Sequence, residues 1–471
     1  MRMSTRELRR STPSAEGVDA ASVAAFVDAL ETHPGIRPHG LVLLRHGAVI
    51  ARAAWAPYRT DRPGLVYSLS KSFTSTAAGF ARAEGLLDLD TPVIDYFPEY
   101  DAEITDPRTR RMTVRHIASM ASGHADETLD RALAAGRGNL IRGFLSIPPD
   151  AEPGTLFAYN QPCTYTLGAI VQRASGQRLV DYLRPRLFDP LGIADAAWEQ
   201  QPPGRDLGFS GLHVTTDAVA RLGQLYLQGG RWGDAQLLDA GWVAEASRVQ
   251  VANPGGSPDW SQGYGLQFWM SRHGYRGDGA FGQFCLVLPE QDAVLALTSE
   301  APDMQAVLEL VWSLLLPAFD APHPDAASDA DLARRLAGAR LAAPALAPHP
   351  DDPAAWDGAA FALDRPTGAA VSIHGVRLRT VGDGWTLTLD DADGPLEVPV
   401  GRGGDWVESA PDGLPIAAAG GWGPGGFVAE LAFLETPHTL RITCPPGGLA
   451  RARWLSEPLG YPGVRALRRP A

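Results

Sequence analysis

Apolar runs divided by short polar turns predict two strand hairpins in the first two thirds of the chain. Residues 39–56 are expected to form a strand, a turn at His46-Gly47 and a second strand. Residues 284–299 are expected to form two more strands, separated by a polar turn at 289–292. Between the hairpins, from Leu69 to about Glu84, small and apolar residues recur at helical spacing. The pattern therefore predicts a fold that mixes strands with helices.

The pattern changes near residue 319. Residues 319–355 are rich in Ala, Pro and Asp and contain a short helical pattern at about 330–341, which is typical of a linker. Beyond them, Gly and Pro clusters separate alternating segments at 370–379, 384–390, 396–400, 426–434 and 438–444. We predict a domain at 1–318, a linker at 319–355, and a small antiparallel sheet or barrel at 356–471. The last part shows no catalytic constellation; capping the site, oligomerisation and stability remain open as its role.

The chain of 471 residues has 41 Lys and Arg against 54 Asp and Glu, a formal net charge of -13. Nucleic acids and anionic membranes attract basic patches, so this balance argues against both as partners. The longest apolar run, residues 307–319, is too short to cross a bilayer and is interrupted by Glu309 and Pro317. The first ten residues are charged and no apolar stretch follows, so we expect no secretory signal.

Three cysteines, Cys163, Cys285 and Cys444, lie far apart among apolar residues. Their odd number and wide spacing predict buried free thiols, and with them a cytoplasmic location. The eleven histidines show no metal-ligand spacing, and neither a phosphate-binding loop nor a Cys-x-x-Cys pair occurs. We therefore expect no metal and no other cofactor.

Lys71 is the only lysine, and every other strongly basic residue is arginine. The abundance of Ala, Gly, Pro and Arg indicates a coding bias that favours Arg wherever only a positive charge is needed. An ammonium group can lose its proton when it is desolvated, whereas a guanidinium group cannot. The single lysine is thus a candidate for a role that requires a neutral amine; chance survival of a surface lysine is the alternative.

Ser68 stands three residues before Lys71, at or near the start of the predicted helix. Residues i and i+3 share a helix face, so the amine can reach the hydroxyl. The helix N-terminus favours negative charge nearby, and its free N–H groups can face an oxyanion. We predict that Ser68 is a nucleophile and that Lys71 takes its proton. A serine N-cap followed by a solvated lysine is the alternative, and Ser70 and Ser72 are rival nucleophiles without the three-residue spacing.

Several stretches of the chain resemble one protein family. Residues 68–75, SLSKSFTS, resemble the first motif of class C β-lactamases, their esterase relatives and DD-peptidases. Further similar stretches follow in the family's order: LLDLDTPV at 86–93, MTVRHI at 112–117 with MASG at 120–123, PGTLFAYNQ at 153–161, and GLHVTTDAVAR at 211–221. The resemblance covers roughly residues 15–318. It implies an α/β (α+β) fold with an antiparallel sheet of five or more strands flanked by helices, a helical subdomain, and a site between the halves.

The resemblance also implies a role for Tyr159. The family carries a tyrosine at this place, which completes the base system and can return a proton to the leaving group. A phenol near an ammonium is expected to have a lowered pKa; an ordinary loop tyrosine is the alternative. The family's asparagine two residues later is Gln161 here, and Asn160 is a second candidate for supplying that amide.

The third family motif, K-T-G or H-x-G on the strand that borders the site, is altered in this chain. The matching segment is GDGAFG at 277–282. Small residues such as Gly279 allow a strand backbone to approach a ligand closely. A backbone N–H from Ala280 or Phe281 would then pair with that of Ser68 as an oxyanion hole.

Asp278 takes the basic position of this motif. A cation there would hold a substrate carboxylate, as β-lactams require, whereas a carboxylate repels one unless nearby Arg276 compensates. A simple turn residue is the alternative. We therefore expect hydrolysis of a small neutral or cationic ester or amide, with weak or absent β-lactamase activity. The alternatives are a non-catalytic ligand-binding relative and a DD-peptidase or β-lactamase proper, and the oligomeric state stays open.

Overall fold

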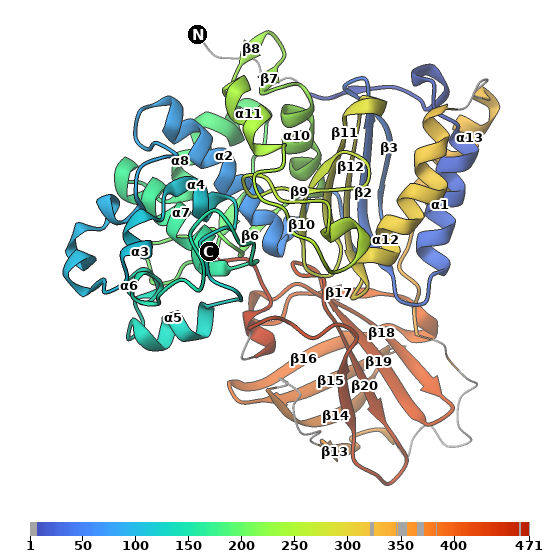
Figure 1. The fold of residues 1–471 in the computed structure, drawn as a ribbon. Coiled ribbons are helices and arrows are strands. Elements are labelled where there is room, and N and C mark those ends of the chain that lie inside the picture. The colour runs from blue at the N-terminus through green and yellow to red at the C-terminus, as the bar shows by residue number, and fades with distance from the viewer. Residues whose placement is uncertain are drawn as a thin grey trace.

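The computed structural model describes residues 7–320, 325–344, 346, 356–364, 372–382, 384–460 and 463–470. Its centre is a seven-stranded sheet in the order β1-β3-β2-β12-β11-β10-β9 (Figure 1). Its neighbouring strands pair antiparallel except β1, which is parallel to β3. The strands are β1 (Arg9–Arg10), β2 (Arg37–Arg45), β3 (Ala48–Ala54), β9 (Trp269–Met270), β10 (Tyr275–Gly279), β11 (Gln283–Leu288) and β12 (Ala293–Glu300). The expected α/β (α+β) fold is confirmed.

Both predicted hairpins lie in this sheet. β2 and β3 are joined at His46 and Gly47, whose φ angles of 49° and 72° are those of the two central residues of a tight hairpin turn. β11 and β12 are separated by a short 3-10 turn at Pro289–Gln291. Their buried central residues explain why the pattern identified them, because each strand contributes apolar side chains to both faces of the sheet.

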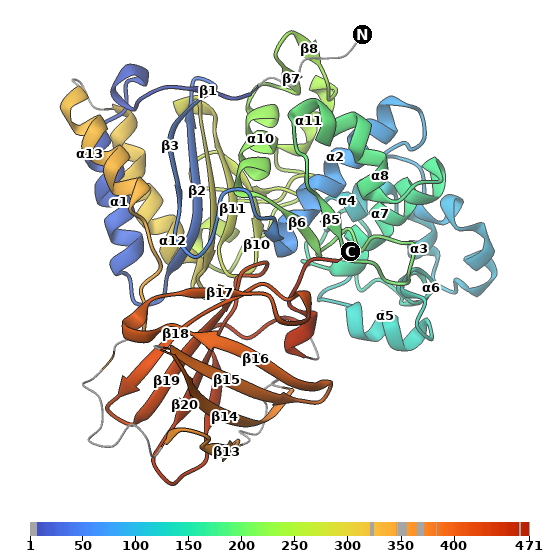
Figure 2. The ribbon, with the colours of Figure 1, turned by 180° about the vertical axis from the view of Figure 1, so that it is seen from behind.

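The two faces of the sheet pack against different helices. Along β2, Leu41 and Leu43 belong to one apolar core and Val42 and Leu44 to another, since successive residues of a strand face opposite ways. Three helices cover the first face: α1 (Ala20–Thr32), α12 (Met304–Leu310) and α13 (Ala326–Ala337). Figure 2 shows them on the side of the sheet away from the other helices. Thus α13, the helix expected at about 330–341, packs on the central sheet.

The second face packs against a helical part centred on α2 (Ser70–Ala83), which is the helix predicted between Leu69 and Glu84 (Figure 1). Every residue from Ser70 to Ala81 is buried. Its hydroxyl side chains are satisfied by neighbouring backbone; Ser75 Oγ, for example, donates to the carbonyl of Leu266 at 2.7 Å. The other helices here are α3 (Pro107–Arg111), α4 (Val114–Ala118), α5 (Leu129–Ala135), α6 (Leu140–Ser146), α7 (Gln161–Ser175), α8 (Leu179–Leu183), α9 (Asp189–Leu191), α10 (Thr216–Leu227) and α11 (Ala240–Ala246).

Two smaller sheets complete the first part of the chain. One has the order β4-β6-β5 and the other is the pair β7-β8. Their strands are β4 (Gly64–Leu65), β5 (Ala197–Trp198), β6 (Leu212–Val214), β7 (Arg231–Trp232) and β8 (Ala235–Gln236). β4 leads directly into the turn before α2, and so the smaller three-stranded sheet helps to fix where that helix begins.

The C-terminal residues form two antiparallel sheets, drawn in orange and red in Figure 1. The first is β13-β14-β15-β16 and the second is β17-β18-β19-β20-β21. Bridges at Leu363 with Ala450 and at Gly401 with Ala419 connect the two sheets near both edges, around one apolar core. The strands are β13 (Ala360–Ala362), β14 (Ile373–Val381), β15 (Gly384–Asp391), β16 (Gly394–Val400), β17 (Val407–Ser409), β18 (Ile416–Gly423), β19 (Gly426–Phe433), β20 (Thr439–Cys444) and β21 (Arg451–Trp454).

The pattern found five of these strands and missed β13, β17, β18 and β21. β18 has the sequence IAAAGGWG, and Ala and Gly have low strand propensity, so only its pairing with β17 and β19 defines it. The first residues of the segment predicted at 370–379 lie outside the described residues, as does part of 319–355. The domain limits at 318 and 355 therefore stay predictions. No helix among the described residues is long and apolar enough to span a membrane.

The end of β10 lies against the backbone that precedes α2. A Cβ atom on Gly279 would be 2.0 Å from the carbonyl oxygen of Val66 and 3.1 Å from the amide nitrogen of Leu69. Both neighbours are backbone atoms, so a side chain at this position would force the two segments apart.

We therefore expect Gly279→Ala to lower the free energy of unfolding by about 1–3 kcal/mol, the usual cost of overpacking. Chemical denaturation measures this change. Gly425→Ala is the control, because a Cβ on Gly425 meets no atom within 4 Å. Equal stability of the two variants would contradict the close approach of β10 to this turn.

Candidate active site

Ser68 and Lys71 lie together at the start of α2. Ser68 is in the 3-10 turn Tyr67–Leu69 that leads into the helix, and Lys71 is in the first helical turn. Lys71 Nζ is 3.0 Å from Ser68 Oγ. Ser68 is half-buried, whereas Lys71 is only 1% exposed. A ligand can thus reach the hydroxyl while the amine is shielded from water, and the alternatives of a surface or solvated lysine are wrong.

Lys71 Nζ has two further hydrogen-bond partners, Gln161 Oε1 at 2.6 Å and the carbonyl oxygen of Phe209 at 2.8 Å. Both oxygens can only accept. Burial lowers the pKa of Lys71 to about 7, because the ammonium group loses its hydration. A neutral amine would donate its two protons to these oxygens and keep its lone pair for Ser68 Oγ. The surroundings of Lys71 therefore suit proton transfer from the serine.

The rival nucleophiles Ser70 and Ser72 are both buried and bonded elsewhere. Ser70 Oγ donates to the carbonyl oxygen of Tyr67 at 2.5 Å and accepts the N–H of Leu212 at 3.1 Å. Ser72 Oγ donates to the carbonyl oxygen of Gln267 at 3.1 Å. These hydroxyls hold α2 in place, and Ser68 is the serine that Lys71 contacts.

Tyr159 lies beside the same amine, with its ring centroid 4.8 Å from Lys71 Nζ. The ring stacks on Trp269 at 5.2 Å and meets Tyr264 edge-on. Burial raises the pKa of Tyr159, and the nearby Asp278 carboxylate raises it further, although a hydrogen bond to Ser68 opposes them. The expected lowering of this pKa is wrong, because desolvation and the Asp278 carboxylate outweigh the groups that lower it. The phenol is therefore protonated at neutral pH and suited to donate.

The structure separates the two amides that follow Tyr159. Gln161 Oε1 accepts from Lys71, so the amide two residues after the tyrosine reaches the site despite the longer side chain. Asn160 does not take its place. Asn160 is the N-cap residue of α7, its side chain is fully buried, and its Oδ1 accepts the N–H and the hydroxyl of Thr128 at 3.1 and 2.9 Å. The expected contact of Asn160 with a substrate is therefore wrong, because this side chain is buried against Thr128.

Asp278 lies inside β10, so its interpretation as a turn residue is wrong. Arg276 Nε donates to Asp278 Oδ2 at 3.0 Å, and both side chains are buried. The two residues are at i and i+2 on one strand, which places them on the same face. Burial raises the pKa of Asp278, and Arg276 opposes this rise. Arg276 thus compensates the carboxylate, and repulsion of a substrate cannot be attributed to Asp278 alone.

The turn that follows β10 carries the proposed second oxyanion donor. Gly279 ends the strand against Val66 and Leu69, which flank the serine turn. Ala280 and Phe281 come next, both half-buried, and Phe281 has a φ of 65°. The two backbone segments that would form an oxyanion hole are therefore in contact, and the choice between the two N–H groups stays open.

Sequence reasoning missed three groups near the amine. Phe209 contributes only its carbonyl oxygen and one ring face, which any residue type can supply in part. Glu127 lies at the surface; its carboxylate accepts the N–H groups of Gln161 at 3.1 Å and Leu129 at 3.0 Å and acts electrostatically on Lys71. Trp269 shields Tyr159.

The arrangement combines a serine hydroxyl, a buried amine, a protonated phenol and nearby backbone N–H groups. Together these are the parts needed for nucleophilic attack on a carbonyl carbon. Among the residues that the structure describes, no three His, Cys, Asp or Glu side chains gather in a way that could hold a metal ion.

Comparisons with known proteins find relatives that are named as hydrolases. Among curated relatives, the 6-aminohexanoate-dimer hydrolase of Paenarthrobacter ureafaciens is 28% identical over 284 residues, 56% of this chain and 72% of that protein. Esterase EstB of Burkholderia gladioli is 29% identical over 222 residues, 41% of this chain and 56% of that protein. The solved structure of a putative 6-aminohexanoate-dimer hydrolase from Bacillus anthracis has a TM-score of 0.54 at 19% identity, covering 67% of this chain and 87% of its own, and shows the same fold.

A family model described as Beta-lactamase matches residues 23–318. The matched region contains α2 with the Ser68–Lys71 pair, as well as Tyr159 and the end of β10. Because this match covers more than half of the 471 residues, the chain belongs to the Beta-lactamase family.

Proposed function

We propose that the protein is a serine hydrolase that cleaves a small ester or amide through an acyl-enzyme on Ser68. The observation that carries this proposal is the 3.0 Å contact between Ser68 Oγ and Lys71 Nζ, with two carbonyl oxygens as the other partners of the amine. The names of the relatives, an amide-dimer hydrolase and an esterase, support a hydrolase of this kind.

Acylation begins when Lys71 takes the Ser68 proton as Oγ attacks the substrate carbonyl carbon. The carbonyl electrons move onto oxygen, and the N–H of Ser68 together with that of Ala280 or Phe281 stabilises the oxyanion. On collapse, the bond to the leaving alcohol or amine breaks. The Tyr159 phenol protonates the leaving group, and the Lys71 ammonium returns a proton to the phenolate.

Deacylation repeats the same chemistry with water as the nucleophile. Lys71 takes a proton from water as the oxygen adds to the acyl carbon. The second tetrahedral intermediate releases Ser68 Oγ, which regains its proton from the Lys71 ammonium. One ester or amide bond and one water are thereby converted into an acid and an alcohol or amine, and the enzyme returns to its starting state.

The charges around the site favour a neutral or cationic substrate. Arg276 and Asp278 form a buried pair, so neither presents an uncompensated charge to a ligand. Glu127 is exposed, its hydrogen-bond partners are backbone N–H groups, and its carboxylate interacts with Lys71. A substrate carboxylate would be repelled by Glu127, whereas an ammonium group would be attracted. For this reason we also propose weak or absent β-lactamase activity.

The cysteines support a cytoplasmic location as part of the proposal. Cys163, Cys285 and Cys444 are all free and buried. Unpaired thiols of this kind are typical of proteins that fold in a reducing compartment.

The first test is covalent labelling. A fluorophosphonate should modify Ser68, as mapped by mass spectrometry of the digested protein, because the amine activates this hydroxyl. Ser68→Ala should lose both labelling and hydrolysis of short-chain aryl esters. Ser70→Ala, which removes a rival hydroxyl, should still be labelled at Ser68. An unmodified wild-type protein would favour the non-catalytic ligand-binding alternative.

The second test concerns the protonation state of Lys71. Lys71→Arg keeps the charge but cannot be deprotonated, so kcat should fall by about 10²-fold or more, the scale of a lost general base. Lys71→Met, which has similar length and no base, should be equally inactive. Since the neutral amine is the active form and its pKa is about 7, kcat/KM on a neutral ester should decrease as the pH falls below about 7. Full activity of Lys71→Arg would contradict the proposed role of Lys71 as the base that takes the Ser68 proton.

The third test concerns substrate charge. We expect kcat/KM to be highest for aryl esters with a neutral or ammonium-bearing acyl chain, and lowest for a carboxylate-bearing chain and a chromogenic cephalosporin. Glu127→Gln should lower the ratio of kcat/KM for the ammonium ester to kcat/KM for the carboxylate ester by up to about fivefold, the scale of an exposed charge pair. Asp126→Asn removes a neighbouring exposed charge that already pairs with Arg131 and should leave the ratio unchanged. Efficient cephalosporin turnover with poor ester turnover would refute the substrate assignment.

A further inference from the structure

A buried hydrogen bond joins the residue before the nucleophile to the C-terminal sheets. The Tyr67 hydroxyl is 2.5 Å from Nε2 of His438, which immediately precedes β20. Tyr67 is 3% exposed and His438 is fully buried. The two residues are 371 positions apart in the sequence. Folding of the C-terminal sheets therefore brings a side chain into direct contact with the turn that carries Ser68.

The orientation of the His438 ring is fixed by its other nitrogen. Nδ1 is 2.9 Å from the carbonyl oxygen of Ser456, which can only accept, so Nδ1 carries the proton. Ser456 Oγ is in turn bonded to the buried carboxylate of Glu300 at 2.6 Å. Burial lowers the pKa of His438 to about 4, so the ring is neutral at neutral pH. Nε2 therefore accepts, and the Tyr67 hydroxyl donates to it.

His438 also contacts the opposite side of the site. The Phe281 ring packs edge-on against His438, at 5.0 Å between centroids, and against Tyr67 at 5.5 Å. The carbonyl oxygen of Phe281 accepts the N–H of Ala301 at 2.9 Å, which holds this turn beside the end of β12. One imidazole thus contacts both Tyr67, which precedes Ser68, and Phe281, which lies in the turn after β10.

Both of these residues have unfavourable backbone conformations. The φ angles are 47° for Tyr67 and 65° for Phe281, in the left-handed region that residues with side chains rarely adopt. Such conformations persist where surrounding contacts hold them in place. For Tyr67 those contacts include His438 and the N–H of Leu459, which is 3.5 Å from the hydroxyl. Both come from the C-terminal part of the chain.

We propose that His438 is a positioning residue for the reaction at Ser68, which makes the C-terminal sheets a working part of the catalytic unit. Its hydrogen bond fixes Tyr67 and thereby the backbone N–H of Ser68, and its ring supports Phe281 in the turn that carries the second oxyanion donor. A displacement of about 1 Å in such groups is enough to slow a reaction by about 10²-fold. The inference rests on the proposed function of Ser68.

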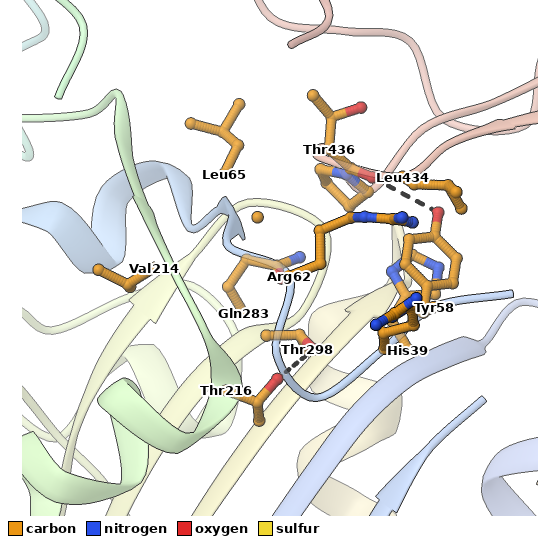
Figure 3. A pocket seen from close by; sticks show the side chains of 13 residues that line it. His39, Tyr58, Arg62, Leu65, Val214, Thr216, Gln283, Thr298, Leu434 and Thr436 are labelled. Carbon is orange, nitrogen blue, oxygen red and sulfur yellow. Dashed lines mark hydrogen bonds between the residues drawn. The ribbon is translucent and has the colours of Figure 1, made fainter. Parts of the chain in front are cut away.

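The chain offers a matched control. The Tyr58 hydroxyl donates to the carbonyl oxygen of Thr436 at 3.4 Å, so it also links the first part of the chain to the loop before β20. The Tyr58 side chain lines a pocket whose lining does not include Ser68 or Lys71 (Figure 3). In this pocket the Tyr58 ring stacks on the His39 ring, with 3.7 Å between the centroids. Tyr58→Phe therefore removes a buried interdomain hydroxyl without touching the Ser68 turn.

The experiment compares Tyr67→Phe, His438→Phe and Tyr58→Phe in the full-length chain. For Tyr67→Phe and His438→Phe, kcat on an aryl ester and the rate of fluorophosphonate labelling should fall by about tenfold or more, with KM within about twofold of wild type. Tyr58→Phe should keep both rates. The double variant Tyr67→Phe/His438→Phe should be no slower than the slower single variant, because both single changes break the same hydrogen bond. Thermal unfolding checks that the variants are folded.

Three outcomes overturn the inference. Labelling of Tyr67→Phe at the wild-type rate shows that the hydrogen bond does not position Ser68, even if His438→Phe does not fold. An equal loss of rate in Tyr58→Phe shows that only the general stability of the interface matters. Absence of Ser68 labelling in the wild-type protein overturns the proposed function and the inference together. Labelling of the wild-type protein and of Tyr67→Phe at equal rates overturns only the inference.

Discussion

A buried amine constrains much of this structure. Lys71 Nζ has Ser68 Oγ and two carbonyl oxygens as its hydrogen-bond partners, none of them a carboxylate. An ammonium group in this position loses its hydration without gaining a direct counter-ion, so burial favours the neutral amine. A carboxylate in place of either carbonyl oxygen would stabilise the ammonium and weaken it as a base. The same burial that makes a lysine unfavourable in a core therefore makes it useful for proton transfer.

Burying this amine requires α2 to be covered on every side. The hydroxyl side chains of the helix bond to carbonyl oxygens of neighbouring segments, and β10 of the central sheet approaches so closely that a Cβ on Gly277 would lie 2.4 Å from Ser72 Oγ. Glycine in β10 allows this approach. The altered third motif is thus compatible with the packing around Ser68, and the charge that the family places there is replaced by a buried Arg276–Asp278 pair.

The C-terminal sheets take part in the same arrangement, although the sequence showed no catalytic pattern in them. His438 contacts the residue before the nucleophile and the turn after β10, and the ring is held by Ser456 and Glu300. A hydrogen bond between two buried neutral groups has a fixed direction and little freedom to move. The Tyr67–His438 hydrogen bond therefore links the C-terminal sheets directly to the turn that carries Ser68.

The sequence alone determined the local features: the Ser68–Lys71 contact, the α2 helix and the hairpins β2–β3 and β11–β12, all set by the repeat of one helix or strand. Tertiary structure alone decided which amide reaches the lysine, that burial raises the pKa of Tyr159, that Arg276 neutralises Asp278, and that His438 lies beside Tyr67. These depend on which distant segments pack around a side chain and exclude water from it. Spacing along the chain fixes neighbours within a few residues, whereas desolvation and long-range contacts exist only once the chain has folded.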